Sequence, residues 1–195
     1  MKLPEVEKFV IEKLNNELPK NLYYHSKAHV MDVLEAALMY GKAENITTYE
    51  TDILKTAVLF HDLGFTVRIK DHEEIGCEMA RQTLPGFEYN TADIEKICGM
   101  IMATRIPQTP ANKLEEIIAD ADLDYLGRDD FWEIGDELYK ELKEYGILSD
   151  EKAWNNLQLN FLSNHRYFTA TAKRMREKKK NEHTEQIRQL VNSYI

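Results

Sequence analysis

The sequence predicts an all-α protein, a bundle of about nine or ten helices formed by one domain over residues 1–195. In most segments apolar residues recur three and four positions apart, the spacing that places them on one face of a helix. No segment alternates apolar and polar residues with the period of two that a half-buried strand requires. Glycine and proline fall between the helical segments, where they favour turns and helix ends. With 43% hydrophobic and 30% charged residues, the chain can bury one sizeable core.

The first three expected helices bring two histidines to inward faces. The first helix lies between Pro4, which a first turn accepts, and Pro19, through which a helix cannot continue. At the start of the second helix, His29 stands four residues before Val33. In the third, His61 continues the apolar stripe one turn later, so both imidazoles are expected to point inward. The two stripes are Val30, Val33, Leu34, Ala37 and Leu38, and then Ile53, Leu54, Ala57 and Val58.

The next two expected helices carry both cysteines. His72 opens the fourth helix on its apolar side, and Thr91 is expected to cap the N-terminus of the fifth. Cys77 and Cys98 lie on apolar faces, which indicates reduced core residues of a cytosolic protein. Two prolines in segment 105–110 exclude helix there.

An aspartate is expected on the apolar face of the helix over Asn112–Leu126. Asp122 lies four residues after Ile118 on that face, whereas Asp120 and Asp124 fall on the opposite face. A buried ionised carboxylate without a partner costs several kcal/mol, and no Lys or Arg lies on the apolar faces to pair with it. An inward aspartate beside two inward histidines therefore implies a bound cation.

The remaining chain is expected to form further helices. One of these helices includes Phe131 and follows the expected helix end at Gly127. Another helix begins after an expected N-cap at Ser149. The basic run Arg174–Lys180 is interpreted as a solvated helix face, and His183, which sits among charged residues, is expected to be exposed. The apolar stripe before this run is Trp154, Leu157, Phe161 and Leu162.

Three short motifs contain the histidines and aspartates named above. They are Tyr24-His25-Ser26-Lys27-Ala28-His29, Leu59-Phe60-His61-Asp62-Leu63-Gly64 and Ala121-Asp122-Leu123-Asp124. In this order they resemble the motifs of the HD superfamily of metal-dependent phosphohydrolases. The resemblance covers about residues 20–130 and continues more loosely through 131–195. It implies an HD-domain helical bundle with a C-terminal helical extension packed on it.

The resemblance implies that His29, His61, Asp62 and Asp122 are the ligands of one divalent metal ion. Two imidazoles and two carboxylates without a thiolate suit Mn²⁺, Mg²⁺, Fe²⁺, Ni²⁺, Co²⁺ or Zn²⁺ alike, and they leave positions for water or substrate. In dinuclear members of the superfamily, a further His helps to hold a second ion. It would stand at the end of the helix that here ends at Arg105, where no His occurs. This departure argues against a second tightly held metal.

The activity that the resemblance implies is hydrolysis of a phosphoester or phosphoanhydride in a nucleotide or another small phosphorylated metabolite. A metal-activated water would be the nucleophile, and Asp62 would orient it. His25, which is similar to the proton donor of the cyclic nucleotide phosphodiesterases, would protonate the leaving group. His72, Arg105 and Arg128 are the candidate substrate-binding residues, with the arginines as clamps on phosphoryl oxygens.

The net charge and the hydropathy of the sequence limit which kinds of partner the protein can bind. A formal net charge of −9 argues against binding to nucleic acid or to anionic membranes. No apolar run approaches the roughly 20 residues of a membrane-spanning helix, and no signal-peptide pattern occurs, so we expect a cytoplasmic protein with a small phosphorylated substrate. Two other functions stay open, an iron-dependent HD-type oxygenase and a non-catalytic sensor that binds a metal or a nucleotide.

Overall fold

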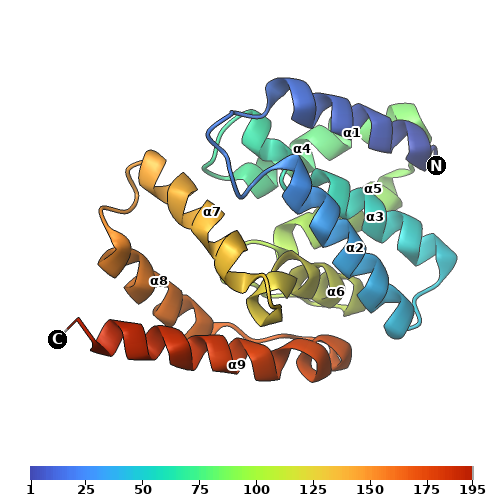
Figure 1. Ribbon diagram of the computed structural model, residues 1–195. Coiled ribbons are helices and arrows are strands. Elements are labelled where there is room, and N and C mark those ends of the chain that lie inside the picture. The colour runs from blue at the N-terminus through green and yellow to red at the C-terminus, as the bar shows by residue number, and fades with distance from the viewer. Residues whose placement is uncertain (195) are drawn as a thin grey trace.

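The computed structural model describes residues 1–194, which form nine α-helices and three short 3-10 helices without any β-strand in that range (Figure 1). The predicted all-α fold is confirmed. No helix in this part of the chain is long and apolar enough to cross a membrane. The α-helices are α1 (Leu3–Glu17), α2 (Lys27–Ala43), α3 (Thr48–His61), α4 (His72–Thr83), α5 (Thr91–Ala103), α6 (Lys113–Asp122), α7 (Phe131–Glu144), α8 (Glu151–Asn164) and α9 (Ala170–Asn192), and the 3-10 helices are η1 (Leu63–Thr66), η2 (Leu84–Phe87) and η3 (Asp124–Gly127).

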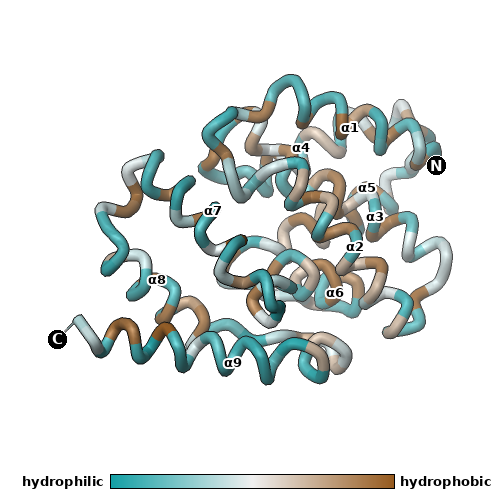
Figure 2. The backbone as a smooth tube through the Cα atoms, in the orientation of Figure 1, coloured by the Kyte–Doolittle hydropathy of each residue, from teal (hydrophilic) through white to brown (hydrophobic). Residues whose placement is uncertain are grey.

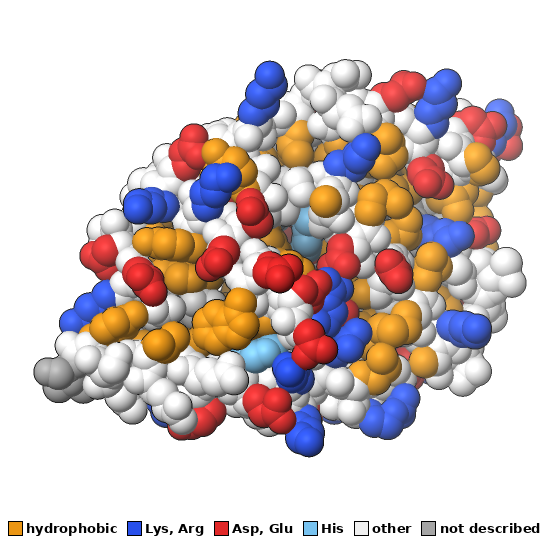
Figure 3. Space-filling model, viewed as in Figure 1, with side chains coloured by type: hydrophobic (Ala, Val, Ile, Leu, Met, Phe, Trp, Pro, Cys, Tyr) orange, Lys and Arg blue, Asp and Glu red, His pale blue; other side chains and the backbone are white. Residues whose placement is uncertain are grey.

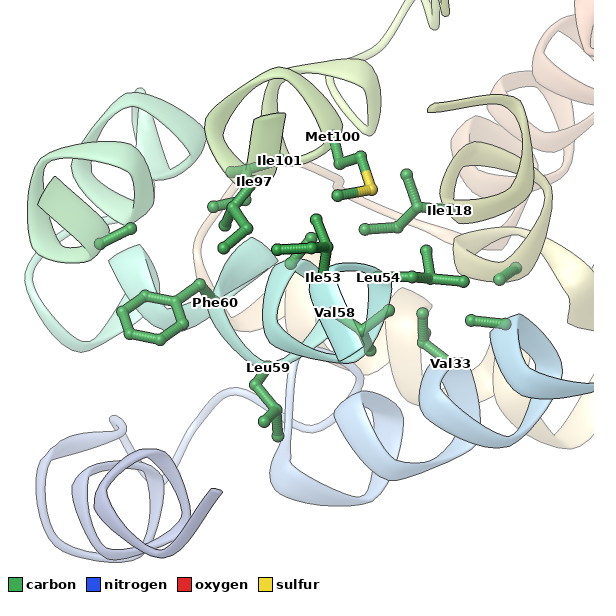
Figure 4. Packing of buried hydrophobic residues seen from close by; sticks show 14 of the residues in the cluster. Val33, Ile53, Leu54, Val58, Leu59, Phe60, Ile97, Met100, Ile101 and Ile118 are labelled. Carbon is green, nitrogen blue, oxygen red and sulfur yellow. The ribbon is translucent and has the colours of Figure 1, made fainter. Parts of the chain in front are cut away.

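Helix α3 forms the centre of the larger hydrophobic core. Its residues from Thr56 to His61 are all buried, because α2, α4, α5, α6 and α1 pack around it. Figure 4 shows Ile53 of α3 near Ile97 of α5, with Ile118 of α6 close by. The second half of α3 is covered on every side and carries the last residue of the helix deep into the protein, which is why His61 is only 1% exposed.

Side-chain caps fix where the helices begin, and two of them differ from the prediction. Asn90, not Thr91, caps α5 by accepting a hydrogen bond from the backbone N–H of Asp93. Asp150, not Ser149, caps α8 in the same way. Both capping residues have extended backbone dihedrals and a short side-chain acceptor, the geometry that an N-cap requires.

A second, smaller cluster of buried hydrophobic residues joins the C-terminal helices to the motif-bearing part. Tyr24 contributes to it from the segment before α2, Phe131 from α7, Leu162 from α8 and Ile187 from α9. Helices α7, α8 and α9 lie on one side of the bundle in Figure 1. This shared cluster supports the proposal that residues 1–195 form a single domain.

Asp120 and Asp124, which the sequence places on the face opposite the apolar stripe, are both buried. Asp120 is fully buried and accepts hydrogen bonds from the backbone N–H groups of Phe168 and Thr169, both at 2.8 Å. These groups lie just before α9 begins. The face of α6 that the sequence leaves polar is therefore covered by the segment that leads into α9, and the carboxylate holds that segment in place.

Asp124 is 2% exposed and binds α9 through Arg176. Its Oδ1 accepts from Arg176 Nε at 2.7 Å, its Oδ2 accepts from Arg176 Nη2 at 3.1 Å, and Tyr40 also donates to it. Close approach is possible because Gly127 lacks a side chain, since a Cβ there would lie 2.5 Å from the Arg176 Cβ. The buried ion pair thus ties η3 to the middle of α9.

The basic run is not uniformly solvated, although α9 is mostly hydrophilic in Figure 2. Lys180, four residues after Arg176, is buried and donates to the carbonyl oxygen of His165 at 2.6 Å. His183 was expected to be exposed but is 3% exposed, and its ring stacks on Phe131 at 4.4 Å. Residues 176, 180 and 183 share the inward face of α9, which packs on α8 and η3.

Candidate functional site

The ends of three helices bring four predicted residues together. His29 lies in the first turn of α2, His61 is the last residue of α3, Asp62 follows it directly, and Asp122 is the last residue of α6. Ser26 caps α2 by accepting from the backbone N–H of His29. We refer to His29, His61, Asp62 and Asp122 as the His-Asp cluster.

The ligand atoms of His29, His61 and Asp122 lie within 4.8 Å of one another, and Asp62 approaches both imidazoles. Asp122 Oδ1 lies 3.2 Å from His29 Nε2 and 3.6 Å from His61 Nε2. Asp62 Oδ2 lies 3.4 Å and 3.3 Å from the same two nitrogen atoms. Donors about 2.1 Å from one ion and at a tetrahedral angle would lie about 3.4 Å apart. The spacing therefore fits one small divalent cation.

Two atoms of the cluster are buried without a hydrogen-bond partner, His61 Nε2 and Asp62 Oδ2. The opposite ring nitrogen, His61 Nδ1, lies 2.7 Å from the Val58 carbonyl oxygen and can only donate to it. Donation from Nδ1 leaves the Nε2 lone pair of a neutral ring free to bind a metal, the arrangement common among metal-ligating histidines. The cluster thus could hold a divalent metal, as the chemistry of its donors predicts.

The electrostatics of the cluster favour positive charge. Burial opposes the charged form of His61, yet the neighbouring carboxylates of Asp62 and Asp122 raise its pKa well above the usual range. Burial also opposes ionisation of Asp122, but the hydrogen bond with His29 and the neighbouring imidazole of His61 lower its pKa to about 2. In addition, α3 and α6 both end here, and helix C-termini carry partial negative charge. A cation would be stabilised by the same groups.

His25 lies beside the cluster and is held by a residue that the sequence interpretation missed. Glu141 of α7, which is buried, accepts from His25 Nδ1 at 2.5 Å and from the backbone N–H groups of Tyr24 and His25 at 2.9 and 3.1 Å. Burial alone would lower the pKa of His25, but the hydrogen bond to Glu141 and the nearby carboxylates raise it. Glu141 follows Leu138 by three residues, so its inward position could have been read from helical spacing.

Phe65 in η1 sets the positions of the two outer imidazoles. Its ring is stacked between His25, at a centroid distance of 4.3 Å, and His72, at 4.0 Å. His72 Nε2 lies 3.6 Å from Asp62 Oδ1 and 3.5 Å from Glu73 Oε1. His72 is therefore at the edge of the cluster, on the side of the second Asp62 oxygen.

The two predicted arginines occupy different places. Arg105 pairs with Glu74 and lies 3.6 Å from Glu73, and its neighbours Thr104 and Ile106 line the cavity described below. Arg128 instead binds Asp32 at 2.8 Å and Asp130 at 2.6 Å, away from that cavity. A substrate contact by Arg128 stays a prediction, and the arrangement does not bring this guanidinium to the His-Asp cluster.

A cavity of about 240 Å³ opens from the cluster toward α7 and α8. His25, Asp62, His72 and Asp122 line one end of it. In Figure 3 a partly covered histidine is visible in a hollow of the surface, and hydrophobic side chains gather over α7 and α8. A small molecule in this cavity would meet the cluster directly.

Comparisons with known proteins agree with this arrangement. The HD domain family matches residues 27–125, a segment that contains all four residues of the His-Asp cluster. No curated protein matches the sequence. The match thus covers just over half of the chain and includes the helices that meet at the cluster.

Several solved structures are similar over nearly the whole chain. YpgQ from Bacillus subtilis, in complex with ADP, is 19% identical with a TM-score of 0.68, and the match covers 98% of this chain and 94% of that one. A predicted HD superfamily hydrolase from an uncultured Thermotogales bacterium is 19% identical with a TM-score of 0.63, covering 98% and 92%. A Lactobacillus plantarum protein is 14% identical with a TM-score of 0.71, covering 98% and 97%. At these identities the likeness establishes a shared fold.

Proposed function

The chain belongs to the HD domain family, and from that premise we propose that it is a metal-dependent phosphohydrolase. Its substrate would be a phosphoester or phosphoanhydride of a nucleotide or another small phosphorylated metabolite. The observation that carries the proposal is the pair of unpartnered buried atoms, His61 Nε2 and Asp62 Oδ2, within a His-Asp cluster that opens to a cavity. Buried polar groups without partners are rare in proteins, and such a pair supports a bound cation at this point.

In this proposal His29, His61, Asp62 and Asp122 hold one divalent ion. When bound, such an ion lowers the pKa of a coordinated water and polarises a phosphoryl oxygen. Asp62 has a second oxygen, Oδ1, that is directed to the side of His72 and can orient the attacking water. His29 and His61 contribute neutral nitrogen donors. The two carboxylates then balance the charge of one divalent cation, so the net charge of the site is close to zero.

His25 is the proposed proton donor. Hydrolysis forms a bond between the water oxygen and phosphorus and breaks the bond to the leaving oxygen, which must take up a proton. The imidazolium of His25 carries that proton on Nε2, since Nδ1 is engaged by Glu141. Glu141 acts through His25, as a positioning residue that stabilises the protonated ring.

The first test of this function is phosphate release from a panel of nucleotides and simple phosphate esters. The full chain would be reconstituted separately with Mn²⁺, Mg²⁺, Zn²⁺ and Fe²⁺. The ADP complex of YpgQ is the reason to include nucleoside phosphates. We expect metal-dependent release that is lost in Asp122→Ala and retained in Asp136→Ala, which alters an exposed aspartate on α7. Stoichiometric metal binding without release from any substrate would instead favour the sensor or the oxygenase.

Glu141→Gln is expected to shift the alkaline limb of the pH–rate profile to lower pH by about one unit. The proton donor works in its charged form, so the rate falls as the pH rises through the pKa of His25. Because the carboxylate of Glu141 raises this pKa, an uncharged amide lowers it, and the rate is lost earlier. The measurement is kcat/KM between pH 5 and 10.

Glu137→Gln is the matched control for this shift. It alters an exposed glutamate one turn earlier on α7 and should leave the profile unchanged. An alkaline limb that does not move in Glu141→Gln would remove His25 from the proton-donor role.

A further inference from the structure

The cavity that leads to the His-Asp cluster is polar at one end and mostly apolar along the rest of its wall, to which Gln158 of α8 also contributes. Beyond the cluster the wall is formed by side chains of α7 and α8, among them Leu138, Leu142, Trp154, Leu157 and Phe161. Such a surface gains free energy only by covering apolar atoms of a ligand. A ligand that reaches the cluster therefore places its non-reacting part against hydrocarbon and aromatic rings.

Within residues 1–194, the cavity is lined by no Lys and no Arg. The nearest guanidinium by sequence, that of Arg105, is paired with Glu74 and lies within 4 Å of Glu73 and Asp71. A polyphosphate group would bring several negative charges into this space. Only the charges next to the His-Asp cluster would find positively charged partners. Unpaired charges in a largely apolar site are costly.

The volume of the cavity also argues against a ligand with several phosphates. Its volume of about 240 Å³ is below the roughly 300–1,000 Å³ of pockets that hold drug-sized ligands. One phosphoryl group with a compact organic group fits that volume, whereas a nucleoside triphosphate would extend out of it. The volume of the cavity and the charge of its lining therefore both favour a ligand with one phosphoryl group and a compact organic group.

We propose that the site prefers phosphate monoesters whose organic group is compact and apolar, and that it discriminates against polyphosphates. This specificity rests on the phosphohydrolase function proposed above and narrows its substrate class. The phosphoryl group lies at the His-Asp cluster, and the organic group lies against the α7 and α8 wall. Ribose hydroxyls and the polar edges of a base would lose hydrogen bonds to water there, which disfavours nucleotides relative to a hydrocarbon of similar size.

The test compares two monoesters that differ in the organic group but release alcohols of similar acidity, and it adds two phosphoanhydrides to test discrimination against polyphosphates. The full chain loaded with Mn²⁺ would be given naphthylmethyl phosphate, ethyl phosphate, ATP and pyrophosphate. We expect kcat/KM for the naphthylmethyl ester to exceed that for the ethyl ester by at least about tenfold, because its rings are covered by the wall. We also expect it to exceed the values for ATP and pyrophosphate.

Leu157→Ser tests the wall itself. This leucine lines the cavity but is 41% exposed, so its replacement should leave the fold intact. We expect the ratio of the two kcat/KM values, naphthylmethyl over ethyl, to fall by about threefold. Leu190→Ser removes a leucine that is 40% exposed on α9 outside the cavity, and it should leave the ratio unchanged. Equal kcat/KM values for the two esters, or faster release from ATP or pyrophosphate, would overturn the specificity.

A binding measurement separates this proposal from the hydrolase proposal. Calorimetric titration of the Mn²⁺-loaded chain with naphthylmethylphosphonate and ethylphosphonate measures affinity without turnover. Tighter binding of the naphthylmethyl compound without hydrolysis of any ester would support the specificity and reject the hydrolase. Hydrolysis with equal phosphonate affinities and equal ester rates would support the hydrolase and reject the specificity.

Discussion

Replacing His61 with alanine is expected to abolish stoichiometric binding of a divalent metal and to lower phosphate release by more than about a hundredfold. Loss of a residue that only supports a metal ligand already costs about 10–100-fold in other metal sites, and His61 is proposed as a ligand itself. The imidazole is 1% exposed and is fixed by its hydrogen bond to the carbonyl oxygen of Val58, which orients Nε2 toward the other residues of the cluster.

The experiment measures bound metal per chain by elemental analysis and phosphate release under the same conditions. His165→Ala is the control, because His165 caps the end of α8 and does not line the cavity. It should retain both metal and activity. Thermal unfolding shows whether each variant is folded. Turnover retained in His61→Ala after the metal is gone would refute the proposed mechanism.

Asp124→Ala is expected to lower the free energy of unfolding by about 3–5 kcal/mol, the usual cost of removing one partner of a buried ion pair. Asp124 is almost fully buried, and without it the guanidinium of Arg176 loses its two hydrogen bonds while staying partly buried. The hydroxyl of Tyr40 loses its acceptor as well. Urea unfolding followed by far-UV circular dichroism measures the change.

Two further variants show whether the loss comes from the unpaired charge. Asp129→Ala removes the partner of Lys179 at the surface, and it should leave the unfolding midpoint almost unchanged because exposed ion pairs contribute little. Asp124→Leu combined with Arg176→Leu should recover much of the stability lost in Asp124→Ala, since neither charge is then buried alone. If the double variant is less stable than Asp124→Ala, the buried charge is not the cause.

The helices and the meeting of the His-Asp cluster could be predicted from the sequence. Helical spacing alone placed His29, His61 and Asp122 on inward faces, and the motif that joins His61 to Asp62 supplied the fourth residue. The structure brings all four within 3.6 Å of a neighbour in the cluster. Their role as metal ligands, like the role of His25, remains a proposal.

The interior of the C-terminal part could not be predicted in the same way. Spacing assigns each helix one apolar face, and Asp120 and Asp124 lie opposite that face on α6 and η3. The structure covers this second face with the approach to α9 and buries both carboxylates. Arg176 and His183 on α9 were read as exposed for the same reason, although both turn toward η3 and α7.

The sequence by itself determined the fold class, the order of the helices and the residues that form the cluster, because those depend on periodicity within single helices and on short motifs. Only the tertiary structure decided which polar faces become buried, which residue holds His25, and how the apolar wall of α7 and α8 meets the cluster. Glu141 lies more than one hundred residues from His25 in the chain, and no local pattern encodes such a pair. Burial of a polar face depends on whether a distant helix covers it, and that is settled when the helices pack together.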